Sequence, residues 1–272
     1  MKRAHLLLFS VVLLVALHVP VCQGAESLEL DGLIEPYMVV NVGSGVPGVL
    51  EAVRVDRGDF VTKDQVLANL QSGVEEAAME LARVRAKMEA TVRARQANVD
   101  FSVRKQARAE ELYRKDVLPF SQMDEAETNR TLAELELQEA LENKRLAELE
   151  FQRAIEVLKR RAIRSPIDGV VVERFLSPGE YVEQQPIMKL AQIHPLNVEV
   201  IVPVSLFGSI KVGMRATVKP EAPVGGEYVA QVKIVDRVVD AASGTFGVRL
   251  ELPNPRYRLP AGLKCVVHFS RR

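Results

Sequence analysis

The residues of this chain that could carry chemistry are few and widely separated. Cys265 and His268 lie close together near the C-terminus, and they could supply two ligands to a metal ion if further ligands came from elsewhere in the fold. Such a pair in an apolar run is more typical of packing in a strand, so we do not predict a metal site. The other histidines stand alone, at His5, His18 and His194. Phosphate-binding loops, nucleophile elbows and paired histidines on one helix face do not occur, so the sequence predicts neither an enzyme nor a bound cofactor.

Charge also restricts the class of partner. The 272 residues contain 36 Lys and Arg and 36 Asp and Glu, so there is no basic excess that would favour a nucleic acid. Local charge is dense and mixed, as in the run Arg104–Glu111. Runs of this kind are typical of the solvent-exposed face of a helix rather than of a binding stripe.

The N-terminus has the pattern of a targeting segment. Lys2 and Arg3 precede an apolar run, and small residues follow at Gly24 and Ala25. We expect cleavage after Gly24. Two alternatives remain open, an uncleaved inner-membrane anchor and a lipoprotein acylated at Cys22, although the residues before Cys22 match a lipoprotein cleavage site poorly. All three place the body of the protein outside the cytoplasm, and cleavage would leave Cys265 as the single cysteine.

Two helical segments form the centre of the chain and must position any site on it. Apolar residues recur in steps of three and four through Val74–Asp116 and again through Ser121–Lys159, which is the pattern of a coiled coil. The seam expected for the first helix includes Val74, Ala78, Leu81, Met88 and Val92, and that for the second includes Met123, Ala126, Ala133, Leu137 and Ala140. The break at 117–120 is only long enough for a turn, so the helices should form an antiparallel hairpin. At the usual rise per residue this rod is roughly 60 Å long.

Local signals mark the ends of these helices. Ser72 with Glu75, and Ser121 with Asp124, have spacings that predict capped N-termini. The second helix is expected to end at Arg160 and Arg161, where cations suit a helix C-terminus.

The segments on either side of the hairpin resemble each other. Gly48-Val49-Leu50 and Gly58-Asp59-Phe60-Val61 align at one constant offset with Gly169-Val170-Val171 and Gly179-Glu180-Tyr181-Val182. Neither half is long enough to bury a core alone, so we expect the two halves to pack on each other. The hairpin is then an insertion in one small domain, with its base fixed and its tip free.

The remainder is predicted to be mainly β. A short strand is expected at Leu28–Pro36, ending at the proline. Beyond Leu196, five short apolar runs separated by Gly and Pro clusters predict a small barrel, with one possible helical turn at 205–211. The fold class is therefore α+β, mainly β with an inserted antiparallel α-helical coiled-coil hairpin.

These features together resemble one known family. Paired half-motifs split by an α-hairpin and followed by a β-barrel are similar to the periplasmic adaptor subunits, or HlyD-like membrane fusion proteins, of tripartite efflux pumps of the resistance-nodulation-division (RND) type. The most specific segment is Ala162–Val171, which resembles the family's segment that re-enters its lipoyl domain, and Gly244-Thr245-Phe246 through Leu263 resembles the last barrel strands. The chain ends soon after the barrel, so the membrane-proximal domain of longer members is expected to be absent or reduced.

The resemblance implies a domain plan. It comprises a signal peptide (1–24), an N-terminal strand assigned to the β-barrel (25–40), a split lipoyl-like or barrel-sandwich hybrid domain (41–72 with 162–191), the coiled-coil hairpin (73–161) and the β-barrel (192–272). It also implies a periplasmic, inner-membrane-associated protein that bridges an inner-membrane RND transporter to an outer-membrane channel. Several copies would form a homo-oligomeric ring, hexameric or trimeric, and no nucleic acid is involved.

The hairpin tip is the implied channel-binding site, with candidate residues Arg114, Leu118, Phe120 and Ser121. Family members that dock on a channel often carry Arg, Leu and Ser where this chain has Glu110, Arg114 and Ser121, so only the serine agrees. Either the chain does not dock on a channel of that kind, or docking uses other residues of the tip, such as Leu118 and Phe120.

Three other functions remain as alternatives. They are an adaptor for an ATP-driven (ABC) exporter or secretion system, a coiled-coil scaffold without a transporter, and a carrier domain with a modified lysine. The carrier lysine of a true lipoyl domain lies in the turn that the helical rod replaces here, and Lys189 occupies a strand position instead. The sequence does not indicate a transported substrate.

Overall fold

The computed structural model describes residues 28–269, and the chain divides into two compact units. One unit contains residues 28–34, 198–252 and 263–269, and the other contains 35–197 and 253–262. The predicted signal peptide, its cleavage site and the alternative lipidation at Cys22 lie outside the described residues. Within residues 28–269, no helix has the length and apolar character needed to cross a membrane.

The second unit contains a small sandwich built from both halves of the internal repeat. The first half supplies β2 (Gly48–Val53), β3 (Phe60–Val61) and β4 (Val66–Leu70), and the second supplies β5 (Ala162–Arg164), β6 (Gly169–Arg174), β7 (Tyr181–Val182) and the start of β8 (Met188–Pro203). The halves exchange strands, because β2 pairs with β7 and β3 pairs with β6. Their apolar side chains share one core, which includes Leu50, Val61, Leu67, Leu70, Val171, Val182, Ile187 and Leu190. Neither half has a core of its own.

The repeated Gly-acidic motif has a structural explanation in two equivalent turns. Gly58 donates its N–H to the carbonyl of Val171 at 2.9 Å, and Gly179 donates to the carbonyl of Leu50 at 2.8 Å. Both glycines have positive φ, +94° and +92°, which other residues rarely adopt. The acidic residue that follows each glycine closes the turn. Asp59 accepts the N–H of Asp56 at 2.7 Å, and Glu180 accepts that of Ser177 at 2.6 Å.

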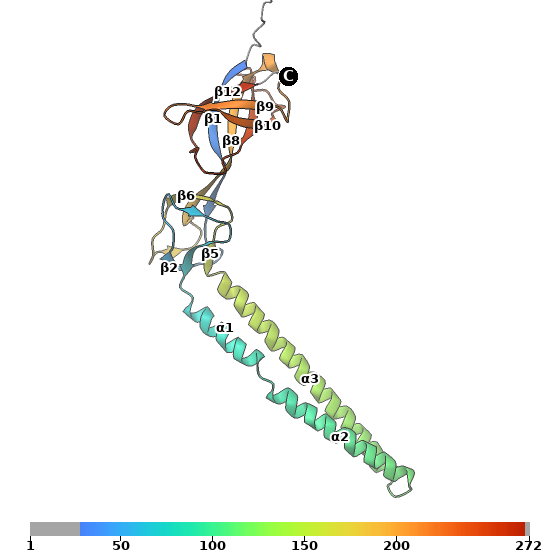
Figure 1. Ribbon diagram of the computed structural model, residues 1–272. Helices are drawn as coiled ribbons and strands as arrows, with labels where there is room; N and C mark the ends of the chain where they lie inside the picture. Colours follow the sequence, from blue (N-terminus) through green and yellow to red (C-terminus); the bar gives the residue numbers. More distant parts are fainter. Residues whose placement is uncertain (1–27, 270–272) are drawn as a thin grey trace, which may run out of the picture. The chain divides into compact units, whose positions relative to one another are not determined.

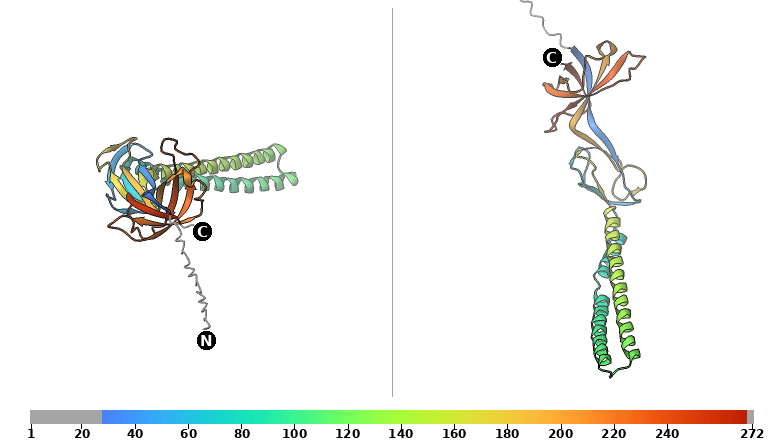
Figure 2. Two further views of the ribbon diagram at one scale, coloured as in Figure 1. Left: turned by 90° about the horizontal axis from the view of Figure 1, so that it is seen from above. Right: turned by 90° about the vertical axis from the view of Figure 1, so that its right-hand side faces the viewer.

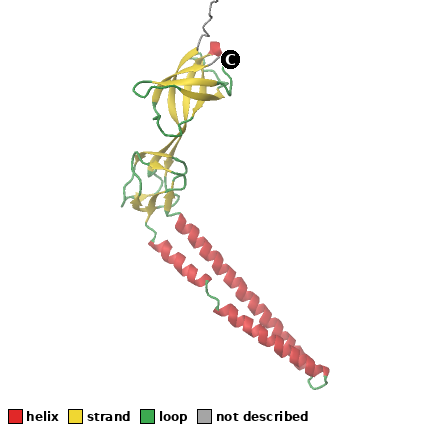
Figure 3. Cartoon of the chain, viewed as in Figure 1, coloured by secondary structure: helices red, strands yellow, loops and turns green. Residues whose placement is uncertain are grey.

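The hairpin consists of three helices rather than the two that the sequence predicts. They are α1 (Gly73–Ala86), α2 (Ala90–Arg114) and α3 (Phe120–Lys159), and Figures 1 and 2 show α1 and α2 running alongside α3. The predicted continuous helix Val74–Asp116 is wrong at Lys87, Met88 and Glu89, which form a non-helical break that appears as a loop in Figure 3. Small residues of α3 face the other helices, as predicted, since Ala126, Ala133 and Ala140 are buried.

Both predicted helix caps are also wrong in detail. The Ser72 hydroxyl donates to a carboxylate oxygen of Glu76 at 2.6 Å and caps no backbone N–H, while Glu75 is bound to Arg161 instead. The third helix begins one residue before Ser121, with Pro119 at its N-cap. Pro119 itself is extended, with φ −63° and ψ 150°, and its missing N–H removes no helical hydrogen bond because it lies before the first turn.

The first unit is a closed β-barrel. Its strands are β1 (Leu28–Val42), β8, β9 (Arg215–Pro220), β10 (Tyr228–Val235), β11 (Thr245–Leu252) and β12 (Leu263–Phe269), with a short 3-10 helix at Val204–Leu206. They follow the order β1-β12-β9-β10-β11-β8, and a β1–β8 pairing closes the ring. Closure leaves no free edge in this order, which protects the barrel from pairing with other chains. The β1 strand continues through Pro36 to Val42, so the predicted end of the first strand at the proline is wrong.

Candidate functional site at the tip and root of the hairpin

The tip of the hairpin is a tight turn between α2 and α3. Asp116 has a φ of +53° and reverses the chain after α2, which asparagine and aspartate tolerate better than most residues. Its N–H donates to the carbonyl of Tyr113 at 3.0 Å, and the N–H of Val117 donates to that of Leu112 at 3.0 Å. These bonds satisfy the carbonyls that the end of α2 would otherwise leave free.

Apolar side chains are prominent at this turn. Val117 is 67% exposed and Phe120 is 60% exposed, and Leu118 is half-buried between them. The Phe120 ring lies edge-on to the ring of Tyr113, with centroids 6.0 Å apart. Ser121 is exposed in the first turn of α3. The structure thus places the predicted tip residues Leu118, Phe120 and Ser121 close together, and it adds Tyr113 and Val117, which no pattern in the sequence indicated.

The two residues that depart from the family pattern pair with each other. Glu110 and Arg114 form an ion pair across one turn of α2, and Lys115 and Glu111 form a parallel pair at 2.6 Å. Pairs with this spacing support an exposed helix only weakly, because water screens them. Arg114 thus lies near the tip but is engaged within its own helix.

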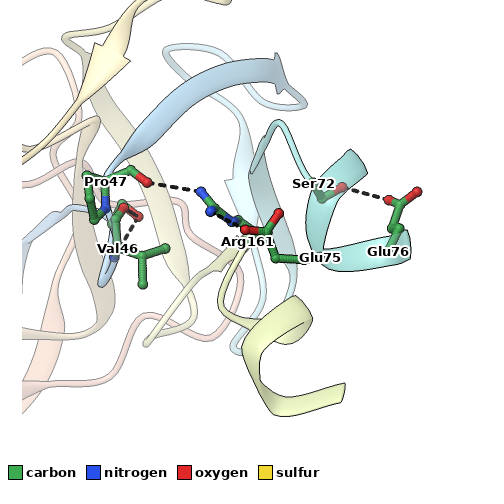
Figure 4. Close-up of polar contacts among 7 residues, drawn as sticks. Val46, Pro47, Ser72, Glu75, Glu76 and Arg161 are labelled. Atoms are coloured by element: carbon green, nitrogen blue, oxygen red, sulfur yellow. Dashed lines mark hydrogen bonds and ion pairs between the residues drawn. The ribbon is translucent and has the colours of Figure 1, made fainter. Parts of the chain in front are cut away.

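The root of the hairpin is joined to the sandwich by Arg161 (Figure 4). Its guanidinium donates to the Glu75 carboxylate of α1 and, through Nη1, to the carbonyl of Pro47 at 3.0 Å. We call this three-residue arrangement the root clasp. The Arg161 hydrogen bond lowers the pKa of Glu75 below its usual value of 4.5. Gly48 leaves room for the clasp, since a Cβ there would lie 2.7 Å from Nη1.

The root clasp was not predicted from the sequence. Arg160 and Arg161 were interpreted as cations at a helix C-terminus, and Arg161 instead binds a residue far away in the chain. Its neighbour Arg160 also reaches the sandwich, donating to the carbonyl of Gly45 at 3.1 Å. The only signal in the sequence was the adjacency of two arginines to the point where the repeat resumes.

The residues considered for chemistry are separated by the fold. Cys265 points into the barrel core and His268 lies on the other face of β12, with its Nδ1 3.3 Å from a carboxylate oxygen of Glu29. Burial, with smaller effects of Asp31 and Glu221, raises the pKa of Cys265 to about 11. Within residues 28–269, no group of three or more His, Cys, Asp or Glu could hold a metal ion. Lys189 lies on β8 opposite Glu173 of β6, and His194 accepts the backbone N–H of Asn254 at 3.1 Å.

Comparison with known proteins agrees with this architecture. A family model described as a CzcB-like, barrel-sandwich hybrid domain matches residues 38–192, and one described as a CusB-like β-barrel domain matches residues 196–272. A UPF0194 membrane protein in the asrC 5′ region of Acidithiobacillus ferridurans is 29% identical over 117 residues. That match spans 39% of this chain and 35% of the relative.

Solved structures share the fold at low sequence identity. MacA from Actinobacillus actinomycetemcomitans has a TM-score of 0.74 at 23% identity, with 90% of this chain and 78% of that chain covered. The membrane fusion protein Spr0693 from Streptococcus pneumoniae R6 has a TM-score of 0.62 at 14% identity, with 90% and 100% covered. These likenesses confirm the predicted fold class.

The first family model covers more than half of the chain and the second covers the region that follows. The chain therefore belongs to the family of periplasmic adaptors, or membrane fusion proteins, of efflux systems, whose members are membrane-associated, non-enzymatic proteins.

Proposed function

We propose that this protein is the periplasmic adaptor of a tripartite efflux pump and that it connects an RND transporter of the inner membrane to an outer-membrane channel. The observation that carries the proposal is the order of the two family matches, a CzcB-like barrel-sandwich hybrid followed directly by a CusB-like barrel of the RND-type models. The helical hairpin inserted in the sandwich supports the same role, because it supplies a rod with one anchored and one free end.

The partner transporter can be identified by affinity purification from membranes. The full-length chain, tagged at its C-terminus and cross-linked in cells, is expected to recover an RND transporter. An ABC exporter in its place would assign the chain to the alternative class of adaptor. Recovery of neither transporter would favour a coiled-coil scaffold and would contradict the proposal.

The channel is proposed to bind the tip formed by Val117, Leu118, Phe120 and Ser121. Its exposed Phe120 and Val117 side chains are the feature that favours this end, since aromatic residues are enriched and charged residues depleted at the core of protein interfaces. A photo-activatable cross-linker on Ser121→Cys should therefore give an adduct with the channel. Thr131→Cys, at an exposed position further along α3, is the matched control and should give little.

Replacement of Phe120 by Asp should reduce the tip adduct without affecting transporter recovery. Absence of any tip adduct from a protein that still recovers its transporter would overturn this assignment of the tip.

Oligomerisation is part of the proposal. By resemblance to the family, we expect a ring of three or six copies, which native mass spectrometry of the membrane-extracted protein would count. The same measurement would give the mass of the mature chain and so separate cleavage after Gly24 from an uncleaved anchor or a lipid on Cys22.

A further inference from the structure

The first helix of the hairpin carries two apolar stripes instead of one. Its half-buried residues, facing α3, are Glu75, Met79, Ala82 and Ala86. One position earlier in the chain lies a second stripe with the same spacing of three and four, formed by Val74, Ala78, Leu81, Arg85 and Met88. We call these the inner and outer stripes. The outer stripe has the larger apolar side chains, yet Val74, Leu81 and Met88 are 80%, 53% and 62% exposed.

The outer stripe, and not the inner one, is in phase with α2. The seam of α2 against α3 consists of Val92, Val99, Ser102, Gln106 and Ala109. A continuous seam needs seven residues between equivalent positions, and Arg85 and Val92 meet this condition. Ala86 is only six residues from Val92. The break at Lys87–Glu89 therefore absorbs a mismatch of one residue, which corresponds to about 100° of rotation around the helix axis.

There is room for the outer stripe beside α3. A groove of about 380 Å³ runs between α1 and α3 near the root, lined by Val74, Glu75, Ala78, Glu150, Arg153, Ala154 and Val157. Two residues of the outer stripe, Val74 and Ala78, already form one wall of it. Rotation of α1 toward this groove would bring the outer stripe against Ala154 and Val157, and it would expose Glu75 and Met79 together with the small side chains of Ala82 and Ala86.

Charged side chains hold α1 in its present rotation. The root clasp binds Glu75 at one end, and Lys144 of α3 binds Glu89 beside the break at 3.1 Å. Arg85 of the outer stripe is compatible with the rotation, because α2 already accommodates an arginine beside its seam. Arg95, which lies between the seam residues Val92 and Val99, pairs with Glu136 of α3 at 2.7 Å.

We propose that α1 is a rotational switch with two packed states. In the present state the inner stripe packs on α3, the helix is broken and the apolar outer stripe faces solvent. In the second state α1 is turned by one residue, the outer stripe packs on α3 and α1 joins α2 in one continuous helix. The root clasp favours the first state, and the phase of the seam favours the second. The switch lies in the hairpin and its root clasp, and it does not depend on which transporter binds the protein.

Disulfide cross-linking distinguishes the two states. The Glu75–Arg161 and Glu89–Lys144 pairs place Ala86 and Met88 near the level of Ala147 on α3. In a background with Cys22→Ser and Cys265→Ala, the pair Ala86→Cys/Ala147→Cys reports the present state and Met88→Cys/Ala147→Cys reports the rotated one. Lys87→Cys/Ala147→Cys is off the seam in both states and gives the background rate.

Release of the clasp should shift the balance between these reporters. With Glu75→Ala, the Met88→Cys pair should oxidise up to about fivefold faster and the Ala86→Cys pair more slowly, as expected for loss of one solvent-screened ion pair. Glu76→Ala is the matched control, since Glu76 contacts Ser72 and not the clasp. Equal rates for the Met88→Cys and Lys87→Cys pairs, with and without the clasp, would overturn the proposal.

A second variant tests the phase argument without disturbing the clasp. One alanine inserted after Met88 restores seven residues between Ala86 and Val92, so the inner stripe comes into phase with α2. This variant should gain helical circular dichroism and should reduce Met88→Cys cross-linking to the background rate. An insertion that left cross-linking unchanged would contradict the proposed switch.

Discussion

At the level of single residues, Gly58 and Gly179 are the clearest case of a repeated sequence motif with a repeated physical cause. Each stands at the turn where one half of the sandwich bonds to the other, and each has a φ above +90°. A side chain is disfavoured in this conformation whatever space surrounds it. The motif is therefore a requirement of the strand exchange and not of a ligand.

Alanine at either glycine should destabilise the sandwich. We expect Gly58→Ala and Gly179→Ala each to lower the free energy of unfolding by about 1–2 kcal/mol, the cost of holding an L-residue at positive φ. Urea titration followed by circular dichroism would measure the loss. Gly45→Ala is the control, because Gly45 lacks a positive φ and has open space around it. Equal effects at all three positions would show that the backbone conformation is not the cause.

The buried thiol of Cys265 predicts a second residue-level effect. Burial raises its pKa from 9.0 to about 11, so between these pH values the unfolded chain loses the thiol proton while the folded chain retains it. The unfolded state then binds fewer protons, and stability falls as the pH rises through this range. A maleimide at pH 7 should label Cys265 in denaturant and not in the folded barrel.

The Cys265→Ala variant checks the cause of this alkaline loss. It should have a flatter stability profile between pH 9 and pH 11, although its overall stability is lower because a small cavity remains. An unchanged profile would exclude the thiol as the group responsible.

At the level of elements, the hairpin could be predicted from the sequence, but the packing of its first helix could not. The steps of three and four identified both helical segments and the turn between them. They also selected Val74, Leu81 and Met88 as the seam, because these side chains are larger and more apolar than Met79, Ala82 and Ala86 as a set. In the structure, Glu75 pairs with Arg161 and Glu89 pairs with Lys144, and these pairs hold the helix with its smaller side chains toward α3. Periodicity gives no information about such long-range contacts.

The root clasp should make the first helix sensitive to acid. The folded pKa of Glu75 lies below its usual value, so the stabilisation is present above pH 4.5 and is lost as the pH falls through the folded pKa. We expect the protection factors of the α1 amides, which correct for slower intrinsic exchange in acid, to fall on acidification before those of the barrel do. The Glu75→Gln variant should exchange faster at neutral pH and respond less to acid. Identical pH responses of this variant and the native chain would show that another group controls α1.

At the level of the whole molecule, the sequence predicted the tip of the hairpin but not its root. The tip follows from local information, since a four-residue break with Pro119 determines where the chain reverses. The root joins Glu75, Pro47 and Arg161, which come from both sides of the insertion, and no local pattern connects them. The family resemblance likewise described the order of the parts and did not reveal the clasp.

The separation of the hairpin from the sandwich core leads to a prediction about folding of the chain. The strands that flank the insertion are neighbours, because Asn69 of β4 pairs with Ala162 of β5 and the Leu70 N–H donates to the Arg161 carbonyl at 2.8 Å. A short Gly-Asn-Gly-Ser linker in place of residues 73–160 would keep this bond and close a hairpin that the sheet already contains. We expect this variant to unfold cooperatively in urea and to lose only the functions of the rod.

Removal of residues 162–191 should have the opposite result. These residues contribute β6, β7 and the start of β8, whose side chains complete the shared core. Without them β2 keeps its pairing with β4 but loses β7, and β3 loses β6. The shortened chain should lack a cooperative transition for the sandwich, because the first half alone cannot bury enough apolar surface. If this chain retained the transition and the hairpin-less variant lost it, the insertion would be the folding core and the strand exchange would be secondary. The shared core and the reciprocal bonds of the two glycine turns favour the first outcome, in which the rod is an appendage of a domain that its two halves stabilise.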